Sequence, residues 1–394
     1  MKLMLPKLFG FVSSILVLTQ NLGQPLSGQE YELRKCDSEE TIVQGLKSHD
    51  RALFIKTGWI RDPYIVLAPD DWFYLTGTTP NPGDPRESAD PFNTGLGDQS
   101  IVGYFMQVWR SRDLIHWESL GTPFSLVDGY WAQVKPEAFA TLDRSDWHLW
   151  APELHFFRNK WHVVHTTPSP VRRGSNLAVT HSDKLQGPYS FPLGELSAGR
   201  HDPSLFVDSD GTVYLLWQNT LVVRLSEDLT TFVGEPMRID PSGSRPGPDG
   251  EPISRIGHEG ATLRKIGETY VHFGTAWSTD LGRKGSYNLY YCTSKDIFGP
   301  YSERRFAGRF LGHGTPFQDR DGKWWCTAFF NGNVPPLELS GIEDRDLRDD
   351  AQTINHQGVT IVPLDVRQLD DGDLWIRAKD PNYAQPGPDE VQQF

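Results

Sequence analysis

A pattern of roughly fifty residues recurs five times along this chain, and it limits the possible folds more than any other feature of the sequence. Each occurrence has a polar residue, a short apolar strand, a turn and an aromatic-led strand, as in HDPSLFVDSDGTVYLLWQN at residues 201–219. Turns such as Ser-Asp-Gly and Arg-Asp-Gly are typical of hairpins. Repeated units of about four short strands are the signature of β-propeller blades. The five occurrences cover residues 61–79, 151–169, 201–219, 258–277 and 313–331.

The repeat predicts an all-β chain that folds as a five-bladed β-propeller with four-stranded antiparallel blades over residues 51–379. We expect the segment 358–379 to close the last blade, joined by a strand near residues 52–58. Residues 29–50 are interpreted as an N-terminal extension with a short helix, and residues 380–394 as a flexible tail. Long helical periodicity is absent, so no second domain is predicted.

The first residues have the layout of a secretory signal peptide. Lys2 and Lys7 precede an apolar run at residues 8–18, which small and polar residues follow. This run is too short to span a bilayer. We therefore expect a signal peptide at about residues 1–28 and a mature protein that is secreted or periplasmic.

Charge and cysteine content exclude several classes of partner and site. The net charge is −13, whereas binding to nucleic acid requires a basic surface, so neither a nucleic-acid nor a membrane partner is expected. Three cysteines allow at most one disulfide. No Cys-x-x-Cys or His-Glu-x-x-His spacing is present, so no zinc site is predicted and no cofactor is expected to be required.

The polar residue at the head of each repeat is the candidate functional feature. In a propeller the innermost strands surround a central channel, so their heads converge on one hollow. Four of the five heads are acidic. Clustered carboxylates raise one another's pKa values and cost stability, so such a cluster indicates a functional site. Paired carboxylates, one protonated and one ionised, are what glycoside hydrolysis requires. The heads are Asp62, Glu153, Asp202, Glu259 and His313.

Four of these segments resemble glycoside hydrolase family 43. They are IRDPYI, HDPSLFVDSDG, HEGATL and LGHGTPFQDRDGKWW, and the resemblance covers about residues 55–335. It implies a five-bladed propeller and inverting hydrolysis, mostly of arabinofuranosyl or xylosyl linkages in oligo- or polysaccharides. It further implies that Asp62 is the general base, Asp202 the residue that modulates the pKa of the acid, and Glu259 the general acid.

The chain departs from the family pattern at two places. Blade two has Trp-Ala-Pro-Glu at residues 150–153 where the family commonly has Asp, and the acid motif is Glu-Gly-Ala at 259–261 instead of Glu-Gly-Pro. Loss of the proline leaves this loop less stiff. The motif LGHG also suggests a structural Ca²⁺ in the central channel, held by His313 through water.

Six residues near these heads are predicted to bind substrate. Aromatic side chains stack on sugar rings but also fill sheet cores, and most of the 13 Trp residues are assigned to the core. The predicted binding residues are Glu153, Trp59, Arg61, Trp150, Trp277 and His313.

Alternatives to this function stay open. A non-catalytic carbohydrate-binding propeller is one, and a hydrolase of algal anhydro-galactose linkages with the same fold is another. The Glu-Cys pair of β-fructosidases and the Ser-x-Asp-x-Gly-x-Thr-Trp boxes of sialidases are missing. Long inserted loops at residues 79–100, 121–148 and 240–256 favour exo action, because they could wall one end of the site.

Overall fold

The computed structural model describes residues 33–89, 100–134, 136–141, 143, 147–167, 174–194, 201–282, 284–331 and 351–394. The expected signal peptide at residues 1–28 lies outside the described residues. No helix in the described ranges is long and apolar enough to cross a membrane.

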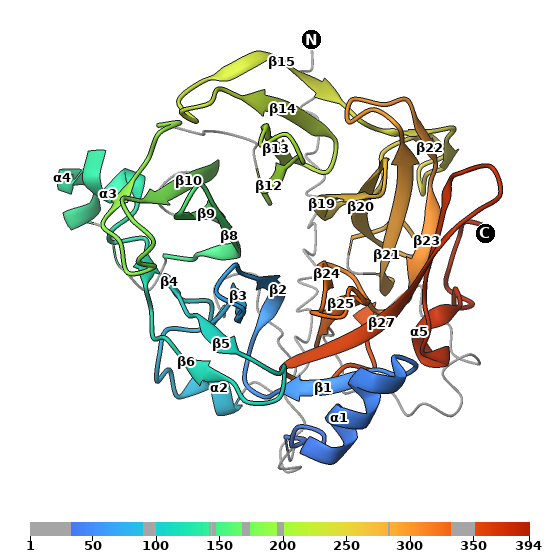
Figure 1. Cartoon of the computed structure of the whole chain (residues 1–394), viewed down its shortest axis with the longest axis horizontal. Coiled ribbons are helices and arrows are strands. Elements are labelled where there is room, and N and C mark those ends of the chain that lie inside the picture. The colour runs from blue at the N-terminus through green and yellow to red at the C-terminus, as the bar shows by residue number, and fades with distance from the viewer. Residues whose placement is uncertain are drawn as a thin grey trace, which may run out of the picture. The chain divides into compact units, whose positions relative to one another are not determined.

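Residues 33–394 contain five small antiparallel sheets arranged around a central axis as the blades of a propeller (Figure 1). This confirms the predicted fold class. Within each of the first four blades the strands follow chain order outward from the axis, so a hairpin always forms the inner pair. The innermost strands of the five blades are β2 (Arg61–Leu67), β8 (Trp150–Phe157), β12 (Ser204–Val207), β19 (Glu259–Ile266) and β24 (Pro316–Gln318).

The remaining strands complete each blade. Blade one adds β3 (Phe73–Thr78), β5 (Trp109–Ser111) and β6 (Glu118–Ser119). Blade two adds β9 (Lys160–Thr167), β10 (Gly174–Thr180) and β11 (Tyr189–Ser190). Blade three adds β13 (Val213–Trp217), β14 (Leu221–Leu225) and β15 (Phe232–Arg238). Blade four adds β20 (Thr269–Trp277), β21 (Gly285–Ser294) and β23 (Arg305–Gly308).

Blade five joins the two ends of the propeller. After β24 it contains β25 (Trp324–Phe329) and β27 (Val359–Gln368), and its outer strand is β1 (Leu53–Lys56). β1 pairs antiparallel with β27, and β27 also pairs with β28 (Leu374–Ala378). The expectation that segments near 52–58 and 358–379 close the last blade is thus confirmed.

Short elements occupy the connections. The helices are α1 (Glu39–Ser48), α2 (Arg86–Ala89), α3 (Tyr130–Val134), α4 (Pro136–Ala140) and α5 (Pro381–Ala384). The short strands are β4 (Phe105–Met106), β7 (Phe124–Ser125), β16 (Pro241–Ser242), β17 (Arg245–Pro246), β18 (Pro252–Ile253), β22 (Tyr301–Glu303) and β26 (Ala351–Gln352). The Ser38 side chain caps α1 by accepting a hydrogen bond from the amide of Thr41, as is usual at helix N-termini.

Apolar clusters fill the spaces between neighbouring blades. One cluster unites Phe73 of blade one, Trp325 of blade five and Leu53 of β1, all at most 2% exposed. The aromatic-led second strands of the repeats contribute many of these residues, which confirms the core assignment of most tryptophans. All three cysteines are free, and Cys292 and Cys326 are buried in this core.

The prediction of a flexible tail at residues 380–394 is wrong. Asp380 caps α5, Tyr383 is 5% exposed, and the Asp389 carboxylate is fully buried in an ion pair with Arg309. The Pro and Gly content of the tail suggested disorder, but buried polar partners on blade four fix its conformation.

Replacement of Leu53 by Ala tests the closure of the ring. Leu53 is 0% exposed and pairs with Ile361, so Leu53→Ala should lower the free energy of unfolding by about 2–5 kcal/mol. Urea unfolding measures this, with Val233→Ala on the outer strand β15 as the control, because Val233 is 45% exposed. If Leu53→Ala cost no more than the control, β1 would contribute little to the ring.

Candidate active site

In every blade, a residue with a left-handed backbone conformation lies at or just before the start of the innermost strand. The φ angles are 49° at Asp62, 44° at Ala151, 47° at Asp202, 64° at Gly260 and 53° at His313. In blades one, two and four the strand pairing is also irregular at this point, as in a β-bulge. A bulge re-aims side chains, and left-handed non-glycine residues cost about 1–3 kcal/mol each and gather at functional sites.

Only three of the five heads have the left-handed backbone conformation. Asp62, Asp202 and His313 occupy the left-handed position, whereas Glu259 precedes it and Glu153 lies two residues after it. Glu259 and Glu153 therefore do not share the backbone position of the other three heads. The side chains that meet in this cluster therefore lie at different positions relative to the left-handed residue of their blade.

Asp62 is held as a carboxylate. Thr78 donates a hydrogen bond to Oδ2 at 2.7 Å, and Nδ1 of His313 lies 3.1 Å from Oδ1. Burial raises the pKa of Asp62, but the charge and hydrogen bond of His313, the Arg61 charge and the Thr78 hydroxyl outweigh burial and lower it below its usual value. An ionised, oriented carboxylate is what a general base requires.

Asp202 connects blade three to the segment that carries Glu259. Its Oδ2 accepts a hydrogen bond from the amide of Gly260 at 3.2 Å, and its own amide donates to Thr166 Oγ1 at 2.7 Å. Burial raises the pKa of Asp202, and the charges of Glu259 and Asp62 add to the rise while His313 opposes it. Asp202 is thus placed to orient the backbone beside Glu259.

Glu259 is fixed through both its side chain and its carbonyl. The hydroxyl of Tyr287 donates to Oε1 at 2.6 Å, and the Glu259 carbonyl accepts from Thr275 Oγ1 at 2.6 Å. The next residue must be glycine, because a Cβ on Gly260 would lie 2.6 Å from Cδ2 of His313. The backbone of Gly260, next to Glu259, therefore packs directly against the His313 ring.

His313 carries the positive charge that makes this cluster possible. Burial lowers its pKa, but Asp62, Asp202 and Glu259 outweigh burial and raise it to about 10. The imidazolium therefore compensates three carboxyl groups from three other blades. The structure brings together Asp62, Asp202, Glu259 and His313, while their catalytic roles stay predictions.

Two of the predicted substrate-binding tryptophans are packing residues. Trp59 is 2% exposed and packs with Ile101 and Val102, which covers the ring that was expected to meet a sugar. Trp277 is 7% exposed and stacks on Tyr287 with ring centroids 4.3 Å apart. The structure places Trp277 behind Tyr287, so direct sugar stacking is reassigned to packing.

The other predicted binding residues differ in position. Trp150 is half-buried and keeps some accessible surface, so a sugar contact stays a prediction. Arg61 is 6% exposed and lies over the Phe329 ring, and its charge acts on Asp62. Glu153 bonds His155 at 2.9 Å and belongs to a polar network of the inner strands β2 and β8.

Sequence reasoning missed Tyr287, which supports Glu259. It lies in the strand-like run GSYNLYYCTS, where an aromatic residue indicates only packing. Nothing in that run identifies the one tyrosine whose hydroxyl reaches an acid 28 residues away.

Comparison with known proteins supports this geometry. The family model named Glycosyl hydrolases family 43 matches residues 54–338, well over half of the chain. This chain belongs to glycosyl hydrolase family 43. The matched range includes Asp62, Asp202, Glu259 and His313.

Two curated relatives and one solved structure illustrate the family relationship. The chain is 26% identical over 292 residues to "Putative beta-xylosidase" of Escherichia coli (strain K12), covering 68% of this chain and 50% of the relative. It is 24% identical over 312 residues to "Xylan 1,3-beta-xylosidase" of Vibrio sp, covering 72% and 50%. The chain spans about half the length of these relatives. The GH43 BlXynB protein from Bacillus licheniformis shares the fold, with a TM-score of 0.54, 20% identity, and coverage of 86% of this chain and 59% of that chain.

The charge of His313 predicts a pH dependence of stability. Because its pKa rises from 6.5 to about 10 on folding, its contribution is complete below pH 6.5 and is lost as the pH rises through about 10. The Tm of the wild type should therefore fall over this window more steeply than that of His313→Gln. Thermal unfolding at a series of pH values measures this, with the exposed His181→Gln as the control. Parallel curves for the wild type and His313→Gln would contradict the assigned charge.

Proposed function

We propose that this family 43 chain is a glycoside hydrolase that cleaves a glycosidic bond with inversion. The observation that supports this most is the contrast within one cluster: Asp62 of blade one is stabilised as a carboxylate by His313, while Glu259 is held by Tyr287 within blade four. One carboxylate ready to accept a proton and a second carboxyl group on another element form the arrangement that inverting glycosidases use.

The proposed steps follow from these positions. Asp62 accepts a proton from a water molecule, whose oxygen attacks the anomeric carbon. Glu259, protonated at the start, donates its proton to the leaving oxygen as the bond from the anomeric carbon to that oxygen breaks. Asp202 orients the acid through the amide of Gly260. The product has the opposite anomeric configuration, and proton exchange with solvent returns both carboxyl groups to their starting states.

The proposed substrates are xylosyl or arabinofuranosyl glycans. The names of two relatives as xylosidases support xylosides as the first choice, although the match covers only 50% of each relative. Exo action and export through a signal peptide at residues 1–28 are further parts of this proposal. A hydrolase of algal anhydro-galactose linkages and a non-catalytic binding propeller are its competitors.

A screen with acid-to-amide variants tests the proposal. Nitrophenyl glycosides and plant and algal polysaccharides serve as substrates, and NMR follows the anomer of the first product. Asp62→Asn and Glu259→Gln should each lower kcat by roughly 10²- to 10⁴-fold on unactivated substrates, because each removes a proton-transfer group.

The control for this screen is Asp321→Asn, whose carboxylate is 76% exposed on a turn of blade five and should leave kcat unchanged. A wild type and Glu259→Gln that are equally inert across the panel, yet bind sugar, would favour a carbohydrate-binding propeller. A first product that retains the anomeric configuration would exclude inversion.

The family resemblance also leads us to propose a Ca²⁺ near His313, held through water. Among the described residues no group of three or more His, Cys, Asp or Glu is placed to hold a metal directly. The His313 ring is protonated and bonded to Asp62, so it cannot be a direct ligand, whereas the nearby carboxylate oxygens suit a hard cation. When bound, the ion would add positive charge beside the carboxylates.

Metal analysis of dialysed protein tests this site. We expect about one Ca²⁺ per chain in the wild type and clearly less in His313→Gln. Calcium that is absent from the wild type, or equally abundant in both, would remove the cation from the channel.

A further inference from the structure

The C-terminal segment 385–394 packs across blade four, which carries Glu259. The amide of Val391 donates to the carbonyl of Ser278 at 3.2 Å, and Tyr290 donates its hydroxyl to Glu390 at 2.6 Å. The Phe394 ring lies 5.6 Å from that of Phe306. The segment is therefore anchored at several points along the outer half of the blade.

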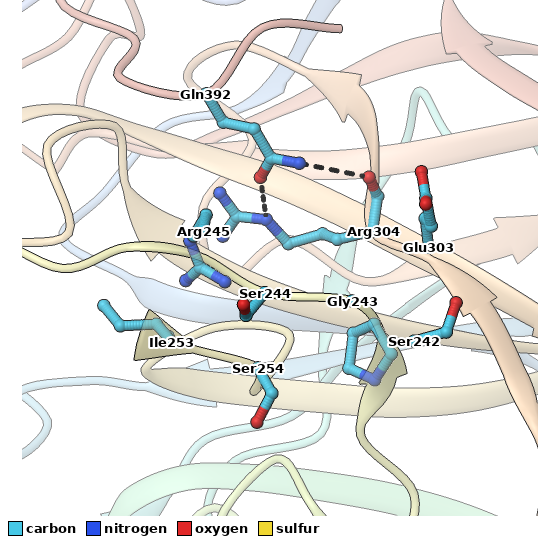
Figure 2. Close-up of a pocket in the computed structure, with 10 residues that line it drawn as sticks. Ser242, Gly243, Ser244, Arg245, Ile253, Ser254, Glu303, Arg304 and Gln392 are labelled. Atoms are coloured by element: carbon cyan, nitrogen blue, oxygen red, sulfur yellow. Dashed lines mark hydrogen bonds between the residues drawn. The ribbon is translucent and has the colours of Figure 1, made fainter. Parts of the chain in front are cut away.

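Gln392 supplies one of these anchors (Figure 2). Its Oε1 accepts from Arg304 Nε at 2.7 Å, and its amide nitrogen donates to the Arg304 carbonyl. Arg304 and Arg245 line a pocket of about 110 Å³ beside this contact. Asp280 pairs with Arg245 at 2.6 Å and Glu390 acts on Arg304, so the two cations at this pocket have acidic partners within the protein.

Asp389 is the centre of the contact between tail and blade. Its side chain is 0% exposed, and Arg309 Nη2 lies 2.7 Å from Oδ1. Oδ2 accepts from the Ser278 hydroxyl at 2.5 Å and from the amide of Ser286 at 2.7 Å, and the Ser286 hydroxyl donates to it as well. Burial raises the pKa of Asp389, but Arg309 and the two serines outweigh burial and keep the carboxyl group ionised.

Ser278 and Ser286 flank the turn between β20 and β21, one residue outside Trp277 and Tyr287. Trp277 and Tyr287 are directly paired across the two strands, with stacked rings. The Tyr287 hydroxyl donates to Glu259. Fixing the two serines therefore fixes the stacked pair and, through it, the carboxyl group of Glu259.

Arg309 begins the segment that leads to His313. Within it, the amide of Gly312 donates to the Tyr287 carbonyl at 2.9 Å. Gly312 has no room for a side chain, because a Cβ would lie 2.1 Å from the Tyr287 ring. The following residue, His313, contacts Asp62. The Asp389 carboxylate thus binds two segments that both contact Tyr287. One segment lies beside Glu259 and the other leads to His313.

We propose that Asp389 is a positioning residue for the hydrolytic reaction: from the C-terminal segment it holds Tyr287, and thereby the general acid, in register with the rest of the cluster. This inference rests on the proposed roles of Glu259 and Asp62. It assigns a functional role to a segment that the sequence predicts to be a flexible tail.

Two substrates with different leaving groups distinguish misplacement of the general acid from a general loss of structure. Departure of 2,4-dinitrophenolate needs almost no protonation, whereas an alkoxide or phenolate leaving group needs the general acid. Asp389→Asn should therefore lower kcat for the phenyl glycoside roughly tenfold to 100-fold, because a small misplacement of a catalytic group has effects of this size. Its kcat for the 2,4-dinitrophenyl glycoside of the same sugar should fall clearly less, because this substrate needs the base but almost no protonation of its leaving group.

Asp380→Asn is the matched control. Asp380 is another buried acid of the C-terminal region, 7% exposed, but it binds the amides of Ala52 and Asn382 at blade five. We expect this variant to lower Tm without changing the ratio of the two kcat values. Ser278→Ala removes one hydrogen bond of Asp389 and leaves the pair with Arg309, so it should move the ratio in the same direction even if Asp389→Asn does not fold.

Glu259→Gln, measured on the same two substrates, separates the two proposals. A selective loss on the phenyl glycoside in Glu259→Gln establishes the acid. If that loss occurs while Asp389→Asn and Ser278→Ala keep the wild-type ratio, the positioning role is overturned and the proposed function stands. If Glu259→Gln shows no selective loss, the proposed function itself is overturned.

Discussion

Closure of the ring by β1 and β27 is the constraint on which the site depends. The acid groups lie on three blades and are separated by 140 and 57 residues along the chain, so only a closed ring of sheets brings them together. Leu53 pairs with Ile361 at this junction and lies in the cluster that joins blades one and five. Since Asp62 begins β2 of blade one and His313 precedes β24 of blade five, their contact spans the same junction. The strand pairing that closes the ring and the contact between Asp62 and His313 thus join the same two blades.

Charge balance is the second requirement. Three carboxyl groups that meet in one cluster repel one another when they are ionised, and burial raises the pKa of Asp62 and of Asp202. His313 affects the pKa values of Asp62 and Asp202 to different extents. It contacts Asp62 directly, whose pKa falls, whereas Asp202 keeps a raised pKa although it interacts with the same imidazolium. One cation in contact with Asp62 therefore separates the pKa of this group from that of Asp202.

The sequence predicted the blades and the acid cluster, but not the details that depend on contacts between distant residues. Periodicity predicts the strands of five blades, because strand patterning is local. The joining of the two ends then follows from the closed ring of a propeller. Periodicity does not show that Glu153 lies two residues after the left-handed position of its blade, because a bulge leaves no sequence signal. The sequence does not show that Trp59 is buried, since burial depends on residues far along the chain. It predicts a flexible tail, because Asp389 among Pro and Gly does not indicate its buried partners.

The missing proline of the acid motif explains why Glu259 has so many supports. Proline at position 261 would stiffen the loop but would have no amide hydrogen to donate. With alanine there, the amide of Ala261 donates to Asn219 Oδ1 at 3.1 Å, a hydrogen bond to blade three that proline excludes. Asp202 binds the neighbouring amide of Gly260, and Tyr287 binds the side chain of Glu259. The position of Glu259 is therefore fixed here by three contacts with residues far along the chain, in place of the local stiffness of a proline.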